Sequence, residues 1–304
     1  MKGAPPAAAP GLYVKLVLIA VIWGGQYTAG RVVAEALPVF TNSALRFIVA
    51  TPILVALVYA WEGGLPRLDG RRFVAMLALA FGGVFVFNVC LFAGLERVPA
   101  ARGALIMALN PVMTALGAWL VFGERMSRVR VFGIALTVAG VIVVITRGEL
   151  GALARGAIGL GELLLFGSVL GWVSYTLIGR AVLKGMSPLG ASAWASLLGM
   201  IMLVACAVFE QPWAALAALP PSGWGAIAYL GALGTVVAFL WFYQGVQKIG
   251  PARASIFLSF VPVFGVLIAA LVLGEPILVS MIVGGAMVVG GVLLTNRPEL
   301  RPAR

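Results

Sequence analysis

The sequence predicts an all-α membrane protein with ten transmembrane helices, arranged as two inverted five-helix repeats. Its 304 residues are 62% hydrophobic and 10% charged, whereas a soluble domain carries about 25% charged residues. The apolar runs are about 20 residues long, the length that a helix needs to cross a hydrocarbon core of ~30 Å. Strands of a membrane barrel would instead give alternating runs of about ten residues. A duplication within the chain is the third observation.

Ten apolar spans follow one another, joined by short links that carry proline and charge. The first five make up a repeat over residues 13–146, and the last five make up a second, inverted repeat over residues 157–295. Residues 1–12 and 296–304 are expected to be short cytoplasmic tails. The spans are predicted at residues 13–34, 39–60, 73–95, 101–121, 129–146, 157–181, 188–209, 223–246, 252–272 and 277–295.

The duplication is clearest where residues 94–141 align with residues 245–292 without a gap, at 16 identities in 48 positions. The two stretches share the order of arginine, proline and Gly-Glu, which chance similarity between apolar segments does not readily produce. Duplicated membrane bundles are common among transporters. The matched pairs include Ala101-Arg102 with Ala252-Arg253, Pro111 with Pro262, and Gly123-Glu124 with Gly274-Glu275.

Two units with an odd number of spans must face opposite ways in the membrane. If the N-terminus is cytoplasmic, the inside segments hold fifteen lysines and arginines and the outside segments hold five. This bias agrees with the positive-inside rule, so both termini are predicted to be cytoplasmic. The first span has the charged start and apolar run of a signal peptide, but its Trp23 and Tyr27 are echoed by Trp172 and Tyr175 in the sixth span. We therefore expect the first span to be retained as part of the repeat.

Composition also limits the chemistry. The chain has no histidine, which removes His-based zinc sites, haem ligation by His and His-dependent catalytic triads. No phosphate-binding Gly-x-x-x-x-Gly-Lys-Ser/Thr motif occurs, and Cys90 and Cys206 lie in apolar runs as core residues do. We therefore expect no enzyme activity, cofactor or metal. The net charge of +11 lies at span ends, as topology-setting cations do, so the expected partners are lipid and a small-molecule substrate, not nucleic acid, in a monomer or homodimer.

Pro111 and Pro262 lie mid-span at equivalent places in the two repeats. A mid-helix proline removes a backbone hydrogen bond and bends the helix, so each is either a packing kink or a hinge that gates a central cavity. Gly123-Glu124 and Gly274-Glu275 are expected to end their helices at opposite faces, each with an interfacial carboxylate. Glycines at sevenfold spacing in the fifth and tenth spans are expected to pack these helices against a neighbour or a dimer partner.

Polar side chains deep in the spans are costly in hydrocarbon and therefore mark a candidate site. With nearby aromatic rings they predict a wet central cavity for an amphipathic solute, although interhelical hydrogen bonding is the simpler explanation for any one of them. For Arg46, snorkelling to the outer surface is favoured over pairing with Glu35 or with a substrate carboxylate. The candidate substrate-binding residues are Trp23, Gln26, Phe85, Asn88, Phe92, Asn110, Trp172, Tyr175, Ser255 and Ser259, with Pro111 and Pro262 as candidate hinges.

These features resemble the EamA family of the drug/metabolite transporter superfamily. The resemblance covers residues 16–295 and rests on Trp23-Gly24 and on two copies of one pattern: small residues, an apolar run, proline, a second apolar run and Gly-Glu. It implies a secondary transporter of a bacterial inner membrane that exports small amphipathic metabolites by alternating access at a midplane cavity.

Within the family, the arrangement is most similar to the bacterial aromatic amino-acid exporters. That similarity implies amino acids, including aromatic ones, as substrates. It points to Trp172 in the sixth span, to the third span from Phe85 to Phe92, and to Ser255 or Ser259 in the ninth. Drugs or purines carried by the same fold are one alternative, and an intramembrane enzyme is an alternative from another class.

Overall fold

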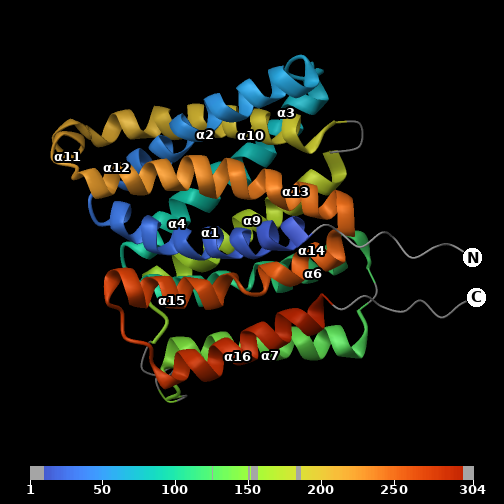
Figure 1. Cartoon of the computed structure of the whole chain (residues 1–304), viewed down its shortest axis with the longest axis vertical. Coiled ribbons are helices and arrows are strands. Elements are labelled where there is room, and N and C mark those ends of the chain that lie inside the picture. The colour runs from blue at the N-terminus through green and yellow to red at the C-terminus, as the bar shows by residue number, and fades with distance from the viewer. Residues whose placement is uncertain (1–9, 125, 150, 152–156, 183–185, 297–304) are drawn as a thin grey trace, which may run out of the picture.

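A computed structural model describes residues 10–124, 126–149, 151, 157–182 and 186–296 of the chain. The regular secondary structure of this part is entirely helical (Figure 1). Nine helical segments in it are long and apolar enough to cross a membrane, and a shorter apolar helix, Val279–Thr295, follows them. The predicted fold class of ten transmembrane helices is therefore confirmed.

The first five spans include two that are divided into shorter helical segments, the third and the fourth. The third span changes from α-helix to π-helix and back, and the fourth is broken in its middle. The elements are α1 (Pro10–Ala34), α2 (Val39–Glu62), α3 (Gly70–Ala80), the π-helical η1 (Phe81–Val86), α4 (Phe87–Leu95), α5 (Ala100–Met107), α6 (Asn110–Phe122) and α7 (Arg128–Thr146).

The last five spans repeat this pattern of interruptions. The eighth span contains a π-helical segment and the ninth is broken in its middle. The elements are α9 (Leu160–Val182), α10 (Pro188–Ala207), the 3-10 turn η2 (Val208–Glu210), α11 (Trp213–Ala217), α12 (Pro221–Ala228), the π-helical η3 (Tyr229–Val237), α13 (Ala238–Ile249), α14 (Pro251–Leu258), α15 (Val261–Leu273) and α16 (Val279–Thr295).

The two mid-span prolines lie where the fourth and ninth spans break. Pro111 is in the first turn of α6 and Pro262 is in the first turn of α15, positions where the missing N–H of proline leaves no helical hydrogen bond unmade. Gly123 (φ 65°) and Gly274 (φ 67°) then end α6 and α15 in the left-handed conformation, which glycine adopts without steric cost. The predicted helix stops are therefore confirmed.

The fifth and tenth spans, α7 and α16, cross at their glycines. A Cβ placed on Gly133 would lie 2.7 Å from the carbonyl oxygen of Gly291, and one placed on Gly140 would lie 2.6 Å from that of Gly284. The earlier glycine of α7 therefore meets the later glycine of α16, so these repeat-equivalent helices are antiparallel and the repeats are inverted. Figure 1 shows α7 and α16 side by side along the lower edge of the bundle. The neighbour expected for these glycines is the equivalent helix of the same chain.

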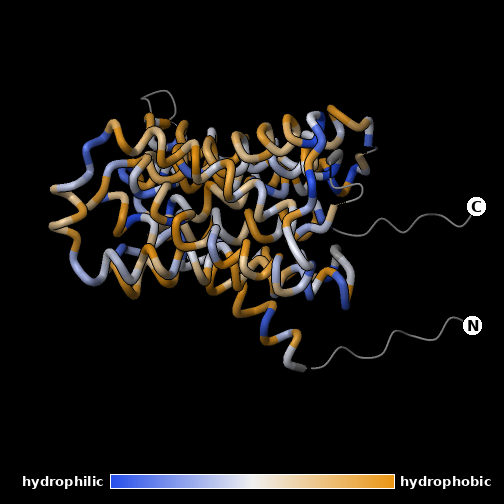
Figure 2. The backbone as a smooth tube through the Cα atoms, turned by 90° about the horizontal axis from the view of Figure 1, so that it is seen from above, coloured by the Kyte–Doolittle hydropathy of each residue, from blue (hydrophilic) through white to orange (hydrophobic). Residues whose placement is uncertain are grey.

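The helix ends lie at two faces, which we name from the described ends of the chain. The terminal face is the one at which α1 begins and α16 ends. The opposite face is the one at which α1 ends and α5 begins. Hydrophilic residues gather toward these faces (Figure 2). Large apolar side chains between them point outward, including Leu120, Val121, Leu271 and Ile282, as the surface that contacts lipid requires.

Candidate functional site

The bundle encloses a cavity of about 540 Å³ that runs from the middle of the spans to the terminal face. Its volume lies in the range of pockets that hold small organic molecules, roughly 300–1,000 Å³. Both repeats line it, mainly through the first four spans of each, and the fifth and tenth spans contribute Arg130 and Val292. Its mouth at the terminal face includes Glu124, Arg130, Arg180 and Asn296.

Most of the candidate site residues meet in this cavity. The lining includes Trp23, Gln26, Asn88, Asn110, Pro111, Trp172, Tyr175, Ser255, Ser259 and Pro262. The π-helical segments contribute residues that the sequence did not single out, among them Val84 and Thr235. The cavity is therefore built where the helices are least regular, as expected for π-helical segments near functional sites.

Phe85 and Phe92 do not line the cavity, so the expectation for these two residues is corrected. Phe92 is fully buried against the glycine at position 30 of α1. The Phe85 ring stacks on Phe81, with 5.6 Å between ring centroids. Phe87 takes the cavity position instead. The reason is η1, because a π-helix has more residues per turn than an α-helix and shifts which side chains face inward.

Aromatic rings form one wall of the cavity. The centroid of the Trp172 ring lies 5.6 Å from that of Phe87 and 5.7 Å from that of Tyr175. The Tyr175 ring in turn rests on Gly83 of η1, where a Cβ would overlap it. Trp23 donates from Nε1 to the carbonyl oxygen of residue 234 in η3 at 2.9 Å. Ring contacts of this kind hold the aromatic side chains of this wall in place.

Arg46 of α2 lies inside the bundle and lines the cavity, with 6% of its surface exposed. Its Nε donates to Thr235 Oγ1 at 3.0 Å. Its Nη1 donates to Asn88 Oδ1 at 3.1 Å, and its Nη2 donates to Gln26 Oε1 at 3.4 Å. The expectation that Arg46 snorkels to the surface is therefore wrong, because side chains of three other spans receive its N–H groups.

Three further residues of the lining each have a buried polar side-chain atom without a hydrogen-bond partner among the described residues. These atoms are Asn110 Oδ1, Thr114 Oγ1 and Ser259 Oγ. All three lie on the broken spans, with Asn110 and Ser259 at the breaks and Thr114 in the second turn of α6. A buried polar atom left without a partner costs free energy. Asn110 Oδ1 can accept a hydrogen bond from a ligand, and the two hydroxyls can accept or donate one.

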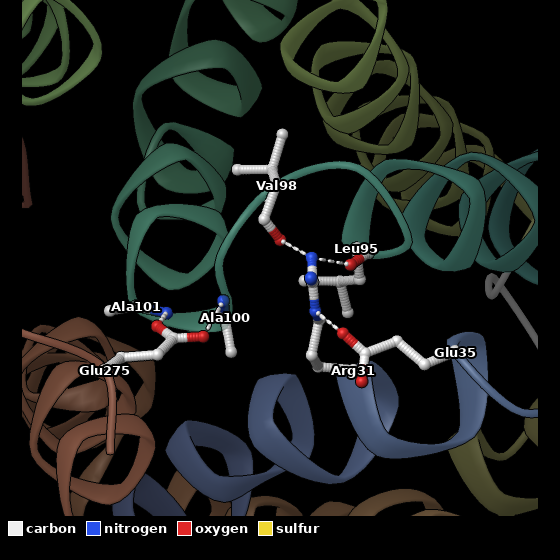
Figure 3. Close-up of polar contacts among 7 residues, drawn as sticks. All are labelled: Arg31, Glu35, Leu95, Val98, Ala100, Ala101 and Glu275. Carbon is white, nitrogen blue, oxygen red and sulfur yellow. Dashed lines mark hydrogen bonds and ion pairs between the residues drawn. The ribbon is translucent and has the colours of Figure 1, made fainter. Parts of the chain in front are cut away.

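The opposite face is closed by contacts between the end of α1 and the link that follows α4 (Figure 3). Arg31 Nη1 donates to the carbonyl oxygens of Leu95 at 2.7 Å and Val98 at 2.8 Å. Its Nε pairs with Glu35 at 2.6 Å. Glu35 therefore pairs with Arg31 at this face, and not with Arg46 inside the bundle. None of the described residues in these contacts lines the main cavity.

Two glutamates strengthen the closure by receiving backbone N–H groups at helix N-termini. Glu275, which follows α15, accepts from the N–H of Ala100 at 2.7 Å and of Ala101 at 2.9 Å (Figure 3). Glu210 accepts from the N–H of Thr41 in α2 at 2.7 Å. A carboxylate at a helix N-terminus satisfies free N–H groups and is favoured by the helix dipole. Each contact joins the second repeat to the first at the opposite face.

Glu124, the repeat equivalent of Glu275, has different partners at the terminal face. It pairs with Arg180 and lies 3.8 Å from the Nη1 of Arg130. Both arginines belong to the mouth of the cavity. The two Gly-Glu copies are thus both interfacial, but Glu275 lies on the closed side of the bundle and Glu124 lies at the mouth of the cavity.

No metal-binding cluster of three His, Cys, Asp or Glu side chains occurs among the described residues.

The sequence model of the EamA-like transporter family matches residues 12–146 and again residues 159–297. The chain belongs to the EamA-like transporter family. This EamA-like protein is therefore a multi-pass membrane transporter, as the resemblance of its sequence motifs implied.

Full-length relatives support the same family. The EamA-like chain is 29% identical over 285 residues to the uncharacterized transporter YyaM of Bacillus subtilis, a match that covers 94% of the chain and 93% of the relative. It is 28% identical over 285 residues to a probable terminal-alkyne amino-acid exporter of Streptantibioticus cattleyicolor, with the same coverage of 94% and 93%. A crystal structure that shares 21% identity matches it with a TM-score of 0.67 over 94% of this chain and 96% of that chain, which shows the fold.

Proposed function

We propose that this EamA-like transporter exports small amphipathic metabolites across a bacterial inner membrane, with amino acids, including aromatic ones, as substrates. The observation that carries the proposal is the composition of the cavity, which joins an aromatic wall at Trp172 to the polar groups around Arg46 and Asn110. The ring of an aromatic amino acid suits the aromatic wall, and its polar ends suit the polar groups. The relative described as an amino-acid exporter supports the same class of substrate.

In the proposed mechanism the cavity opens alternately to the two faces. In this conformation it reaches the terminal face, and the contacts of Arg31 and Glu275 close the opposite face. The broken spans would bend at Pro111 and Pro262 as the two repeats exchange roles. The count of cations at the span ends favours a cytoplasmic terminal face, in which case substrate would enter the cavity from the cytoplasm.

Replacing Trp172 by alanine tests the proposal. We expect the variant to lower counterflow of tryptophan or phenylalanine in proteoliposomes about two- to tenfold, because ring–ring contacts are worth about 0.5–1.5 kcal/mol beyond the area that they bury. The matched control is Trp213→Ala, since Trp213 lies in α11 with 71% of its surface exposed. A wild type that moves no amino acid from a mixed metabolite pool, or a Trp172→Ala variant that transports as the wild type does, would contradict the proposal.

A further inference from the structure

The guanidinium of Arg46 is held in a fixed orientation by neutral partners. Asn88 donates from Nδ2 to the carbonyl oxygen of Val84 at 2.7 Å, which leaves its Oδ1 to accept from Arg46. Thr235 donates its hydroxyl to the carbonyl oxygen of Leu230 at 2.8 Å, which leaves a lone pair on that hydroxyl for the Nε of Arg46. Neither neighbour can turn its acceptor away without losing a second hydrogen bond.

The positive charge of Arg46 has no carboxylate partner in the described part of the chain. The ion pairs in that part join other residues, all nearer the two faces. An arginine in the middle of a span is costly, and such residues mark substrate or ion pathways when they face a cavity. A buried charge is stabilised when an opposite charge joins it, so this site is suited to an anion.

We propose that Arg46 binds the carboxylate of the transported solute. The inference rests on the proposed function and narrows its substrates to carboxylates. The bonds to Thr235, Asn88 and Gln26 use the Nε–H and one N–H of each terminal nitrogen, which leaves one N–H on each terminal nitrogen of the guanidinium. The planar guanidinium binds carboxylates through paired N–H groups of this kind.

The amino end of the solute meets a different environment. The acceptors without a partner, Asn110 Oδ1 and Ser259 Oγ, are neutral, and the carboxylate in the lining, Glu124, lies at the mouth of the cavity at the terminal face. A neutral acceptor binds an ammonium less strongly than a carboxylate does. The carboxylate of the solute should therefore matter more for binding than its ammonium.

A competition series in proteoliposomes tests this order in the wild type. Counterflow of labelled tryptophan is competed by tryptamine, which lacks the carboxylate, and by indole-3-propionate, which lacks the ammonium. We expect tryptamine to compete at least tenfold more weakly than indole-3-propionate, as charge-assisted hydrogen bonds to a buried arginine require. If tryptamine competes as well as the acid, the inference is overturned.

Variants of Arg46 then assign the preference to this residue. Arg46→Gln is expected to weaken tryptophan binding tenfold or more and to abolish the difference in competition between indole-3-propionate and tryptamine. Arg46→Lys keeps the positive charge but lacks the paired N–H groups of the guanidinium, so it should keep part of the preference for the acid. Arg97→Gln is the matched control, because Arg97 is exposed and pairs with Glu96. An Arg46→Gln variant that elutes and unfolds like the wild type and still prefers the acid would refute the assignment.

Failure of the proposed function can be told apart from failure of this inference. If the wild type moves no amino acid but takes up labelled benzoate or a short dicarboxylate in an Arg46-dependent manner, the amino-acid proposal is wrong and the carboxylate site stands. If the wild type takes up tryptamine but none of these carboxylates, the carboxylate site is wrong.

Discussion

Replacing Glu275 by alanine is expected to shift the protein toward a state that is open at the opposite face of the bundle. Its carboxylate receives the first free N–H groups of α5, from Ala100 and Ala101, and so ties the end of the ninth span to the start of the fourth. Loss of a capping side chain costs about 0.5–2 kcal/mol. Since 1.4 kcal/mol changes an equilibrium constant tenfold, the variant should raise the ratio of molecules open at the opposite face to molecules closed there by a factor on the order of ten.

The shift can be measured as a distance between spin labels at Glu96→Cys and Ile277→Cys, both exposed positions at the opposite face, in a background without Cys90 and Cys206. We expect the Glu275→Ala variant to broaden this distance distribution toward longer values. Glu35→Ala is the matched control, because the exposed pair between Glu35 and Arg31 is an i,i+4 contact of the kind worth about 0.3–0.5 kcal/mol. Equal distributions for Glu275→Ala and the wild type would show that this cap does not keep the face closed.

Adding one methyl group at Gly284 is expected to destabilise the whole protein. Its Cβ would lie 2.6 Å from the carbonyl oxygen of Gly140, and a backbone atom of a packed helix cannot move aside as the end of a side chain can. Overpacking of this kind costs about 1–3 kcal/mol. The Gly284→Ala variant should therefore lose half of its monodisperse protein in detergent at a lower temperature than the wild type does.

Gly225→Ala is the matched control for this prediction. Gly225 lies in α12, and a Cβ placed on it would meet nothing within 4 Å. Alanine also favours helix over glycine by about 1 kcal/mol, so this variant should be as stable as the wild type or more stable. Equal unfolding temperatures for Gly284→Ala and Gly225→Ala would mean that α7 and α16 do not pack as closely as the structure has them.

The membrane spans could be predicted from the sequence because hydropathy and length determine which segments can cross a bilayer. The repeat also drew attention to Pro111 and Pro262, which were expected to bend continuous helices and instead lie in the first turn of α6 and α15, just after a break in each span. Side-chain direction was harder to predict in the third span, where the π-helical turn of η1 exchanged Phe85 and Phe92 for Phe87. Such a turn depends on packing against other spans, such as that of Gly83 against the Tyr175 ring.

Long-range partners explain the other differences between expectation and structure. Arg46 is held by Gln26, Asn88 and Thr235, which come from three other spans, and no local pattern indicates that these side chains converge. The signal in the sequence was the isolation of one arginine deep in an apolar segment. The two Gly-Glu copies show the same limit, because Glu275 caps α5 of the other repeat whereas Glu124 pairs with Arg180, and the shared motif does not distinguish these partners.

The crossing of α7 and α16 has a mechanical consequence. At Gly133 with Gly291 and at Gly140 with Gly284, the backbone of one helix lies against the backbone of the other, and a change of side-chain rotamer cannot relieve these backbone contacts. The two helices lie at the edge of the bundle (Figure 1) and join the first repeat to the second there. In the proposed alternating access, the motion that carries a solute across the membrane would then be confined to the other eight spans, and α7 and α16 would stay still in the bilayer.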